Sequence, residues 1–123
     1  MQRSMLKSKI QNAIVTDANI EYEGSMTIAE DIMEAADIIE NEKIQVVNVT
    51  NGSRLETYAI KGRRESGNMI LNGAAAKLMH RGDKVIVLTY VSLSEEEAKN
   101  HFPRIVRLNG KNNITSFIAS DAV

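Results

Sequence analysis

Hydrophobic and polar residues alternate loosely over residues 3–15. Alternation with period two is typical of a β-strand that keeps its polar side chains on one face. Asp17, Ala18 and Asn19 then predict a turn, and renewed alternation over residues 20–23 predicts a second short strand that ends at Gly24. The apolar positions of the first strand are Met5, Leu6, Ile10, Ala13, Ile14 and Val15.

The pattern changes its period after Thr27, where apolar residues recur at spacings of three and four up to Ile39. This spacing predicts an amphipathic helix of about three turns. Thr27 followed by Glu30 three residues later is a capping-box pattern, so we expect the helix to begin beside Ser25. The apolar helix positions are Ile28, Ile32, Ala35, Ala36 and Ile39.

The rest of the chain predicts short strands separated by turns. β-Branched and apolar residues indicate strands over residues 43–49, 54–60, 68–71, 84–91, 104–108 and 114–119. Turns are expected at Asn51-Gly52, Gly82-Asp83 and Asn109-Gly110, and short helical turns over residues 77–80 and after Ser94. Six to eight strands with one main amphipathic helix predict a mainly β fold, and closure into a small barrel would remove unpaired sheet edges.

Composition narrows this picture. The 123 residues suffice for one domain, residues 1–123, with one core. Lys and Arg number 15 against 16 Asp and Glu, with the signs mixed along the chain, so we expect no nucleic-acid partner. There is no cysteine, no apolar run of membrane-spanning length and no signal-peptide core near Met1, so we expect a cytoplasmic protein with no membrane partner.

The junction between Gly24 and Ser25 has the chemistry for cutting the backbone. Gly24 has no side chain to shield its carbonyl carbon. The hydroxyl of Ser25 can attack that carbonyl and convert the amide into a weaker ester, and elimination followed by hydrolysis would leave a ketone on residue 25. Glycine–serine pairs are also ordinary turn and cap formers, so taken alone this pair predicts only a connection.

Four motifs occur in register along the chain: residues 5–10, residues 22–25 with Tyr22-Glu23-Gly24-Ser25, residues 51–58 and residues 72–76. With these motifs the chain resembles the pyruvoyl-dependent aspartate 1-decarboxylase family nearly from end to end. The resemblance implies a double-psi β-barrel with one main helix and short helical turns. It also implies a homotetramer whose active sites lie between neighbouring subunits, and a lyase that makes β-alanine for pantothenate biosynthesis.

By this resemblance, the pro-protein cuts itself between Gly24 and Ser25. The products would be a β chain of residues 1–24 and an α chain of residues 25–123, whose first residue carries a pyruvoyl group made from Ser25. The residue matching Thr57 hydrogen-bonds the Gly24 carbonyl and aids the cut. The sequence leaves open whether a helper protein assists.

The resemblance also assigns residues to the decarboxylation of L-aspartate. The substrate amine would form a Schiff base with the pyruvoyl ketone, which acts as an electron sink when CO₂ leaves. Tyr58 would then donate a proton to the former α-carbon. Arg54 and Lys9 would hold the carboxylates, for which the planar fork of arginine is well suited. Thr57, Asn72, Gly73, Ala74 and Ala75 complete the expected substrate-binding set.

Without the resemblance, each of these residues has a structural interpretation. Arg54 and Lys9 would be solvated charges, Tyr22 and Tyr58 half-buried strand aromatics, and Thr57 a strand former. His80 and His101 have no ligand spacing, so no metal site is expected. Gln11 and Asn12 stand where most family members have His and Arg. The competing hypothesis is an uncut barrel that serves as a binding or assembly module.

Overall fold

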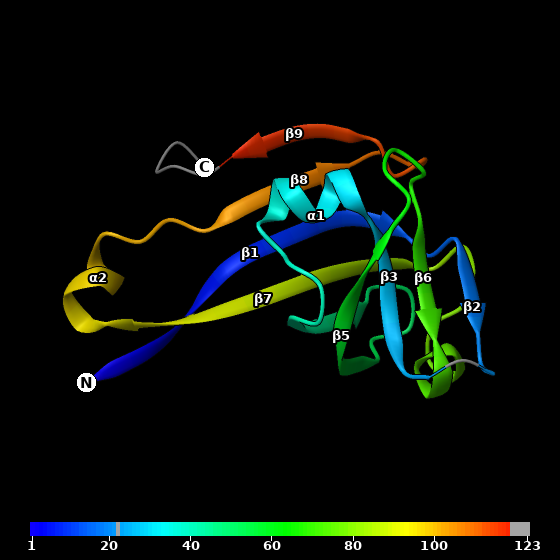
Figure 1. Cartoon of the computed structure of the whole chain (residues 1–123), viewed down its shortest axis with the longest axis horizontal. Helices are drawn as coiled ribbons and strands as arrows, with labels where there is room; N and C mark the ends of the chain where they lie inside the picture. Colours follow the sequence, from blue (N-terminus) through cyan, green and yellow to red (C-terminus); the bar gives the residue numbers. More distant parts are fainter. Residues whose placement is uncertain (22, 119–123) are drawn as a thin grey trace.

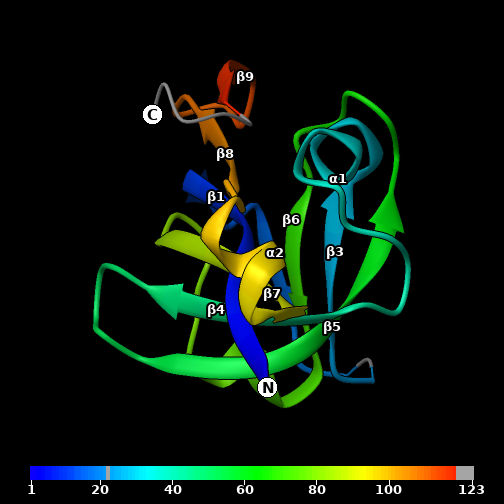
Figure 2. The same ribbon diagram turned by 90° about the vertical axis from the view of Figure 1, so that its left-hand side faces the viewer.

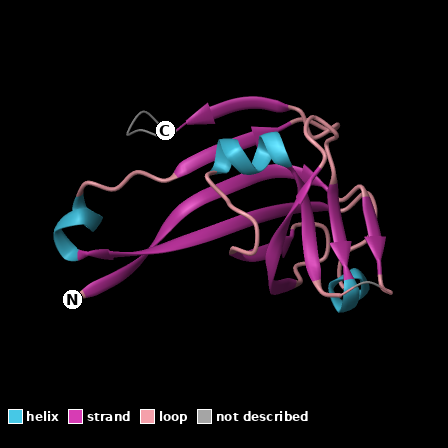
Figure 3. Cartoon of the chain, in the orientation of Figure 1, coloured by secondary structure: helices cyan, strands magenta, loops and turns pink. Residues whose placement is uncertain are grey.

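The computed structural model describes residues 1–21 and 23–118, and in these it has nine strands, two α-helices and one 3₁₀ helix (Figures 1 and 3). The strands are β1 (Gln2–Ile14), β2 (Asp17–Asn19), β3 (Ser25–Ala29), β4 (Lys43–Asn48), β5 (Arg54–Gly62), β6 (Met69–Asn72), β7 (Lys84–Ser94), β8 (Arg104–Leu108) and β9 (Ile114–Ile118). The helices are α1 (Glu30–Ala36), the 3₁₀ helix η1 (Gly73–Lys77) and α2 (Glu95–Lys99).

The strands form one mixed sheet in the order β2-β6-β3-β5-β4-β7-β1-β8-β9. Strand β5 connects its two parts, because residues 54–58 pair antiparallel with β4 and residues 59–62 pair in parallel with β3. The two parts lie at a steep angle to each other when the molecule is turned (Figure 2). The mainly β, barrel-like class predicted from the sequence is confirmed, with a sheet that does not close in the described residues.

The inward faces of both parts share one hydrophobic cluster. Ile10 of β1, Met26 of β3, Ile44 of β4 and Val87 of β7 are fully buried in it. Burying a side chain of this size stabilises a fold by about 1.5–3 kcal/mol relative to leaving it in water. Along β3, Ser25 and Thr27 alternate with the buried Met26 and Ile28, so the other face of this strand carries polar side chains that are available for function.

The structure reverses two predictions before the junction. Asp17–Asn19, predicted as a turn, is strand β2, which pairs in parallel with β6. Residues 20 and 21, predicted to begin a strand, form a turn instead, and Ile20 is exposed. The prediction for Tyr22 lies outside the described residues. Pairing with β6 therefore overrides the turn preference of Asp and Asn.

The predicted helix over residues 27–39 is wrong in its first and last parts. Residues 25–29 form β3, and α1 begins only at Glu30, with Ala29 as an N-cap that makes no side-chain hydrogen bond. The Thr27–Glu30 capping box is therefore not formed, and Ser25 starts a strand instead of preceding a helix. The reason is that Met26 and Ile28 enter the core while Ser25 and Thr27 face away, which is period two. α1 ends before Asp37, which has a left-handed conformation.

The strands and turns after residue 43 follow the prediction closely. Gly52 takes φ 79° in the Asn51-Gly52 turn between β4 and β5. Ser94 caps α2 in a complete capping box, since its Oγ accepts a hydrogen bond from Glu97 N and Glu97 Oε1 accepts one from Ser94 N. The hydrogen bond from the Ser94 backbone is the main reason that the pKa of Glu97 is lowered. The helical turn predicted over residues 77–80 lies earlier, as η1.

Strands β1 and β7 pair antiparallel from Gln2 opposite Ser94 to Ile14 opposite Lys84. Their outer ends form an arm that carries α2 away from the rest of the molecule (Figure 1). The pairing shifts between Ile10 and Ala13, where Asn12 has φ 64°. Asparagine tolerates this left-handed conformation better than most residues, which gives Asn12 a local structural role. In the described residues, no helix is long and apolar enough to cross a membrane.

Candidate active site

Gly24 and Ser25 lie where the chain enters β3 from the turn that follows β2. Ser25 is the first residue of the strand and pairs with Asn72, the last residue of β6. Both side chains are nearly buried, with 6% of Ser25 and 8% of Asn72 exposed. The serine of the predicted cleavage junction is therefore held inside a sheet, while Gly24 in front of it is exposed.

Four polar residues form a row across adjacent strands on the face of the sheet away from the core. Asn19 of β2 pairs with Asn72 of β6, and Asn72 pairs with Ser25 of β3. The parallel register that puts Met26 opposite Ala59 brings Tyr58 of β5 abreast of Ser25. Neighbouring strands lie about 4.8 Å apart, so the sheet brings the predicted residues Ser25, Tyr58 and Asn72 together.

The side-chain amide of Asn72 orients the Ser25 hydroxyl. Its Nδ2 donates one hydrogen bond to Ser25 Oγ at 3.0 Å and another to Thr27 Oγ1 at 3.1 Å. Ser25 Oγ donates in turn to the carbonyl oxygen of Glu23 at 3.5 Å, the outer limit for such a bond. The hydroxyl oxygen is thus fixed by a buried donor, while its proton is only weakly bound.

Two hollows lie on either side of the junction. The larger, a cleft of about 470 Å³, contains the row of four with Asp17, Glu23, Thr27 and Ile70. The smaller, about 270 Å³, is lined by Gly24, Leu55, Glu56, Thr57, Ala74, Ala75 and Leu78. The peptide bond between Gly24 and Ser25 therefore joins residues that line different hollows, with Thr57 on the Gly24 side and Tyr58 on the Ser25 side.

Neither lack of space nor backbone conformation requires glycine at position 24 within this chain. A Cβ added there would meet no atom within 4 Å, and its φ is not in the left-handed region. Gly73 is different, because it begins η1 with φ 74°, which glycine adopts most readily. That turn follows Asn72, and Ala74 and Ala75 then line the wall of the smaller hollow together with Thr57. In the described part of the chain, no hydrogen bond joins Thr57 to Gly24.

A network that we call the Leu78 latch fixes the far end of this wall. The carbonyl oxygen of Leu78 accepts hydrogen bonds from Asn48 Nδ2 at 3.3 Å, Asn51 Nδ2 at 3.1 Å and Ser53 Oγ at 3.3 Å. Asn48 Nδ2 also donates to Asp83 Oδ2 at 2.8 Å. The pKa of Asp83 is lowered, chiefly by the hydrogen bond from the His80 backbone N–H and then by that from Asn48. The latch ties η1 to the hairpin that begins β5.

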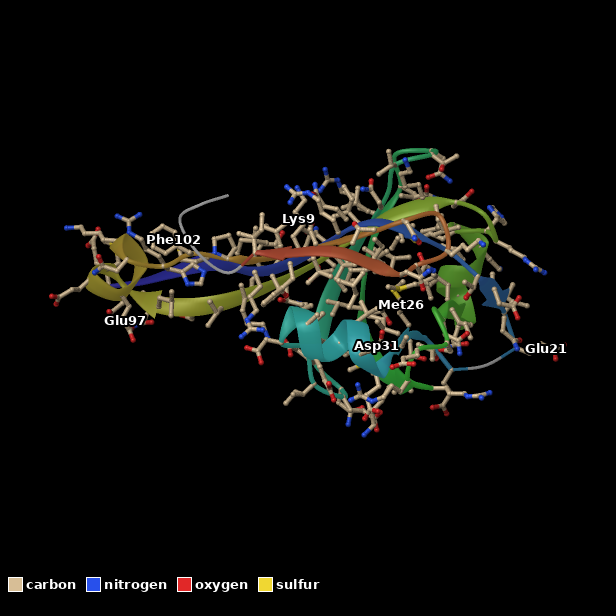
Figure 4. All side chains as sticks on the ribbon, turned by 90° about the horizontal axis from the view of Figure 1, so that it is seen from above. Lys9, Glu21, Met26, Asp31, Glu97 and Phe102 are labelled. Atoms are coloured by element: carbon tan, nitrogen blue, oxygen red, sulfur yellow. The ribbon has the colours of Figure 1, made fainter. Side chains whose placement is uncertain are left out.

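Lys9 and Arg54 are not brought to the junction by this chain. Lys9 is on β1, which β7 and β4 separate from β5, and it lies near the middle of the molecule while Glu21 lies at one end (Figure 4). Arg54 is exposed at the start of β5, and neither residue lines a hollow beside Gly24 or Ser25. A carboxylate held by both would need a further chain or a different arrangement.

Five residues that line the larger cleft were not predicted as site residues from the sequence: Asp17, Asn19, Glu23, Thr27 and Ile70. Asn19 was hidden by the turn prediction and Thr27 by the helix prediction. The alternation of Ser25 and Thr27 with Met26 and Ile28 was the signal that would have found Thr27. Among the described residues, no group of three His, Cys, Asp or Glu side chains is arranged to hold a metal ion.

A family model for aspartate decarboxylase matches residues 1–115. The chain is 57% identical over 114 residues to the aspartate 1-decarboxylase of Syntrophomonas wolfei, covering 93% of this chain and 97% of that protein. It is 58% identical over 110 residues to that of Caldicellulosiruptor saccharolyticus, covering 89% and 86%. The enzyme of Halalkalibacterium halodurans is 50% identical over 121 residues, covering 98% and 95%.

Proposed function

This chain belongs to the aspartate decarboxylase family, and from that premise we propose that it cuts itself between Gly24 and Ser25 and then converts L-aspartate to β-alanine and CO₂. The observation that carries the proposal is the row of Asn19, Asn72, Ser25 and Tyr58. In this row the Ser25 hydroxyl is buried and oriented by Asn72, and the Tyr58 phenol is on the neighbouring strand. The carbonyl of Gly24 directly precedes Ser25 in the chain.

The proposed cut uses atoms of the chain and one water. Ser25 Oγ attacks the Gly24 carbonyl carbon, the bond from that carbon to Ser25 N breaks, and the hydroxyl proton ends on the freed amine. Loss of a proton from the Ser25 Cα then expels the Gly24 carboxylate, which leaves with the former Oγ. Water replaces the remaining nitrogen, which departs as ammonia. The open surroundings of Gly24 and the fixed Oγ of Ser25 support this order of events.

The resulting pyruvoyl group supplies an electrophilic ketone that accepts the substrate amine and takes up the electrons released with CO₂. The residues around position 25 fit such a group. The N–H of Asn72 that donates to Ser25 Oγ would lose that acceptor in the cut and become available to the ketone oxygen, which an amide donor suits. The cleft of about 470 Å³ leaves room for a four-carbon amino acid beside it.

Tyr58 is proposed to return a proton to the substrate carbon that loses CO₂. It lines the same cleft as Ser25, on the strand next to it. A phenol is a competent acid when it lies within hydrogen-bond reach of the carbon. Thr57, in the other hollow with Gly24, is proposed to act earlier, as a hydrogen-bond donor to the carbonyl under attack.

Arg54 and Lys9 are proposed to bind the carboxylates of aspartate from a neighbouring copy in a homotetramer. The separation of both residues from Ser25 within one chain supports this arrangement. Fixed positive charge is needed because the substrate has two carboxylates. Family membership also supports a place in pantothenate biosynthesis in the cytoplasm.

An activity assay tests the proposed reaction. Purified protein incubated with L-aspartate should release CO₂ and β-alanine in equal amounts. Borohydride should inactivate it faster when aspartate is present, because the substrate then becomes covalently attached through its amine. A fully cut protein that yields no β-alanine would refute the reaction, and a protein that stays uncut would favour the binding or assembly module.

A further inference from the structure

Thr27 shares the hydrogen-bond donor that orients Ser25. Both residues face the larger cleft from β3, two positions apart and therefore on the same face of the strand. Asn72 Nδ2 donates to Thr27 Oγ1 at 3.1 Å and to Ser25 Oγ at 3.0 Å, so its two N–H groups have one acceptor each. The hydroxyl of Thr27 is therefore the second fixed point of the Asn72 side chain.

Gly62 at the end of β5 leaves room for the methyl group of Thr27. A Cβ built on Gly62 would lie 2.9 Å from Thr27 Cγ2 and 3.2 Å from the carbonyl oxygen of Ile28. The φ of Gly62 is outside the left-handed region, so the position needs glycine for space and not for backbone conformation. The methyl group of Thr27 fills that space, and a β-branched side chain packed in this way has a restricted χ1. Its hydroxyl is thereby directed to Asn72.

Maturation removes one of the two acceptors of Asn72. In the proposed cut, Ser25 Oγ leaves as part of the Gly24 carboxylate. Once Ser25 Oγ has left, the Asn72 amide can rotate more freely, unless its remaining acceptor is held rigidly. Thr27 is that other acceptor, and the cut leaves it chemically unchanged.

We propose that Thr27, fixed by its contact with Gly62, is a positioning residue that keeps the Asn72 amide directed at residue 25 after the Ser25 hydroxyl has gone. This inference rests on the proposed function, because it assumes the conversion of Ser25. It assigns Thr27 a role in the mature enzyme and little role in the cut, during which Asn72 still has Ser25 as a partner.

The first test compares Thr27→Val with Thr27→Ser. Valine keeps the shape and removes the acceptor, whereas serine keeps the acceptor. Thr27→Val should cut itself within about twofold of the wild-type rate but lose about tenfold in kcat/KM, the scale of one hydrogen bond. Thr27→Ser should keep kcat/KM within about threefold. Equal values for wild type and Thr27→Val would overturn the proposal, and so would a Thr27→Val protein whose cut slows as much as its turnover.

A readout independent of turnover is the side-chain NH₂ signal of Asn72 in ¹⁵N NMR spectra of the cut protein, assigned by its loss in Asn72→Asp. Wild type should give a dispersed, slowly exchanging pair, and Thr27→Val a pair shifted toward free amides with faster exchange. An unchanged pair in Thr27→Val would count against Thr27 as the fixed point. If the wild-type protein stays uncut and inactive, the proposed function fails. If the wild-type protein is cut and active, and Thr27→Val leaves both kcat/KM and the Asn72 signal unchanged, only this inference is refuted.

The role of Gly62 is tested by combining substitutions. Gly62→Ala should push the Thr27 methyl aside and reproduce the loss of kcat/KM seen in Thr27→Val. In a Thr27→Ser background the same substitution should cause a smaller loss, because serine has no γ-methyl to displace. Gly110→Ala is the matched control, since a Cβ there meets no atom within 4 Å and its φ is ordinary. Equal losses from Gly62→Ala in both backgrounds would contradict the Thr27–Gly62 contact as the cause.

Discussion

Two parts of the proposed active site differ: one chain brings the residues around the Gly24-Ser25 junction together, but it does not bring Arg54 and Lys9 to that junction. At the junction, β2, β6, β3 and β5 bring four polar side chains into one row, and the serine among them is buried and hydrogen-bonded. Arg54 and Lys9 lie outside both hollows beside the junction, on strands that β4 and β7 separate. Under the proposed function, we therefore expect the cut to depend on groups within one chain and the binding of aspartate to depend on assembly.

The substitution with the largest expected effect is Ser25→Ala. It removes the attacking oxygen, so both the cut and decarboxylation should fall below detection. The hydroxyl contributes no apolar core contact, and the variant should therefore fold and assemble like wild type, as circular dichroism and size-exclusion chromatography would check. Any β-alanine formed by pure Ser25→Ala protein would break the link between the junction and catalysis.

Tyr58→Phe separates the two events within the junction itself. We expect a normal cut, because the phenol is on the Ser25 side of the peptide bond and Thr57 is on the Gly24 side. Decarboxylation should fall by about 10²–10⁴ in kcat, the usual contribution of a positioned acid. The measurement pairs fragment analysis on a denaturing gel with β-alanine production. Normal turnover would remove Tyr58 as the proton donor.

Arg54→Lys tests the cationic half of the comparison. The charge is kept but the two parallel hydrogen bonds of the guanidinium are lost, so KM for aspartate should rise about tenfold, equivalent to about 1.4 kcal/mol. The cut should proceed at the wild-type rate, because Arg54 lines neither hollow at the junction. Steady-state kinetics and a cleavage time course measure both. An unchanged KM would argue against bidentate recognition, and a slower cut would contradict the separation of the two regions.

The smallest effect is expected at Asp83 in the Leu78 latch. Folding lowers the pKa of Asp83, so its carboxylate stabilises the fold above its unfolded value of about 4, and this contribution disappears as the pH falls through the lower folded value. Asp83→Asn should lower the free energy of unfolding by about 1 kcal/mol at pH 7. Urea unfolding at pH 7 and near pH 3 should show that the difference in unfolding free energy between wild type and Asp83→Asn becomes smaller in acid. If this difference were the same at both pH values, the destabilisation would come from packing and not from the charge of Asp83.

The sequence was most informative where local chemistry and tertiary structure agree. The Asn51-Gly52 turn and the short helix after Ser94 are both confirmed, because each is decided by residues within a few positions of one another. The predictions for residues 17–21 and 27–29 were wrong. There the pairing of β2 with β6 and of β3 with β5 and β6 overrides local turn and helix preferences, and those partners are distant in sequence.

The candidate site divides in the same way. Ser25, Tyr58 and Asn72 were expected together from the resemblance, and the register of β3, β5 and β6 brings them together. Thr27 was assigned to a helix cap, so its place beside Asn72 was not foreseen. The roles of Arg54 and Lys9 stay predictions, because a sequence specifies which charges exist and not which copy of the chain supplies them.

The most direct measurement is the intact mass of the purified, aged protein under denaturing conditions. We predict two polypeptides, residues 1–24 and residues 25–123, the second lighter by one ammonia than a chain that begins with serine. A single unmodified polypeptide of 123 residues would contradict self-cleavage at Gly24-Ser25, and with it the origin of the reactive ketone.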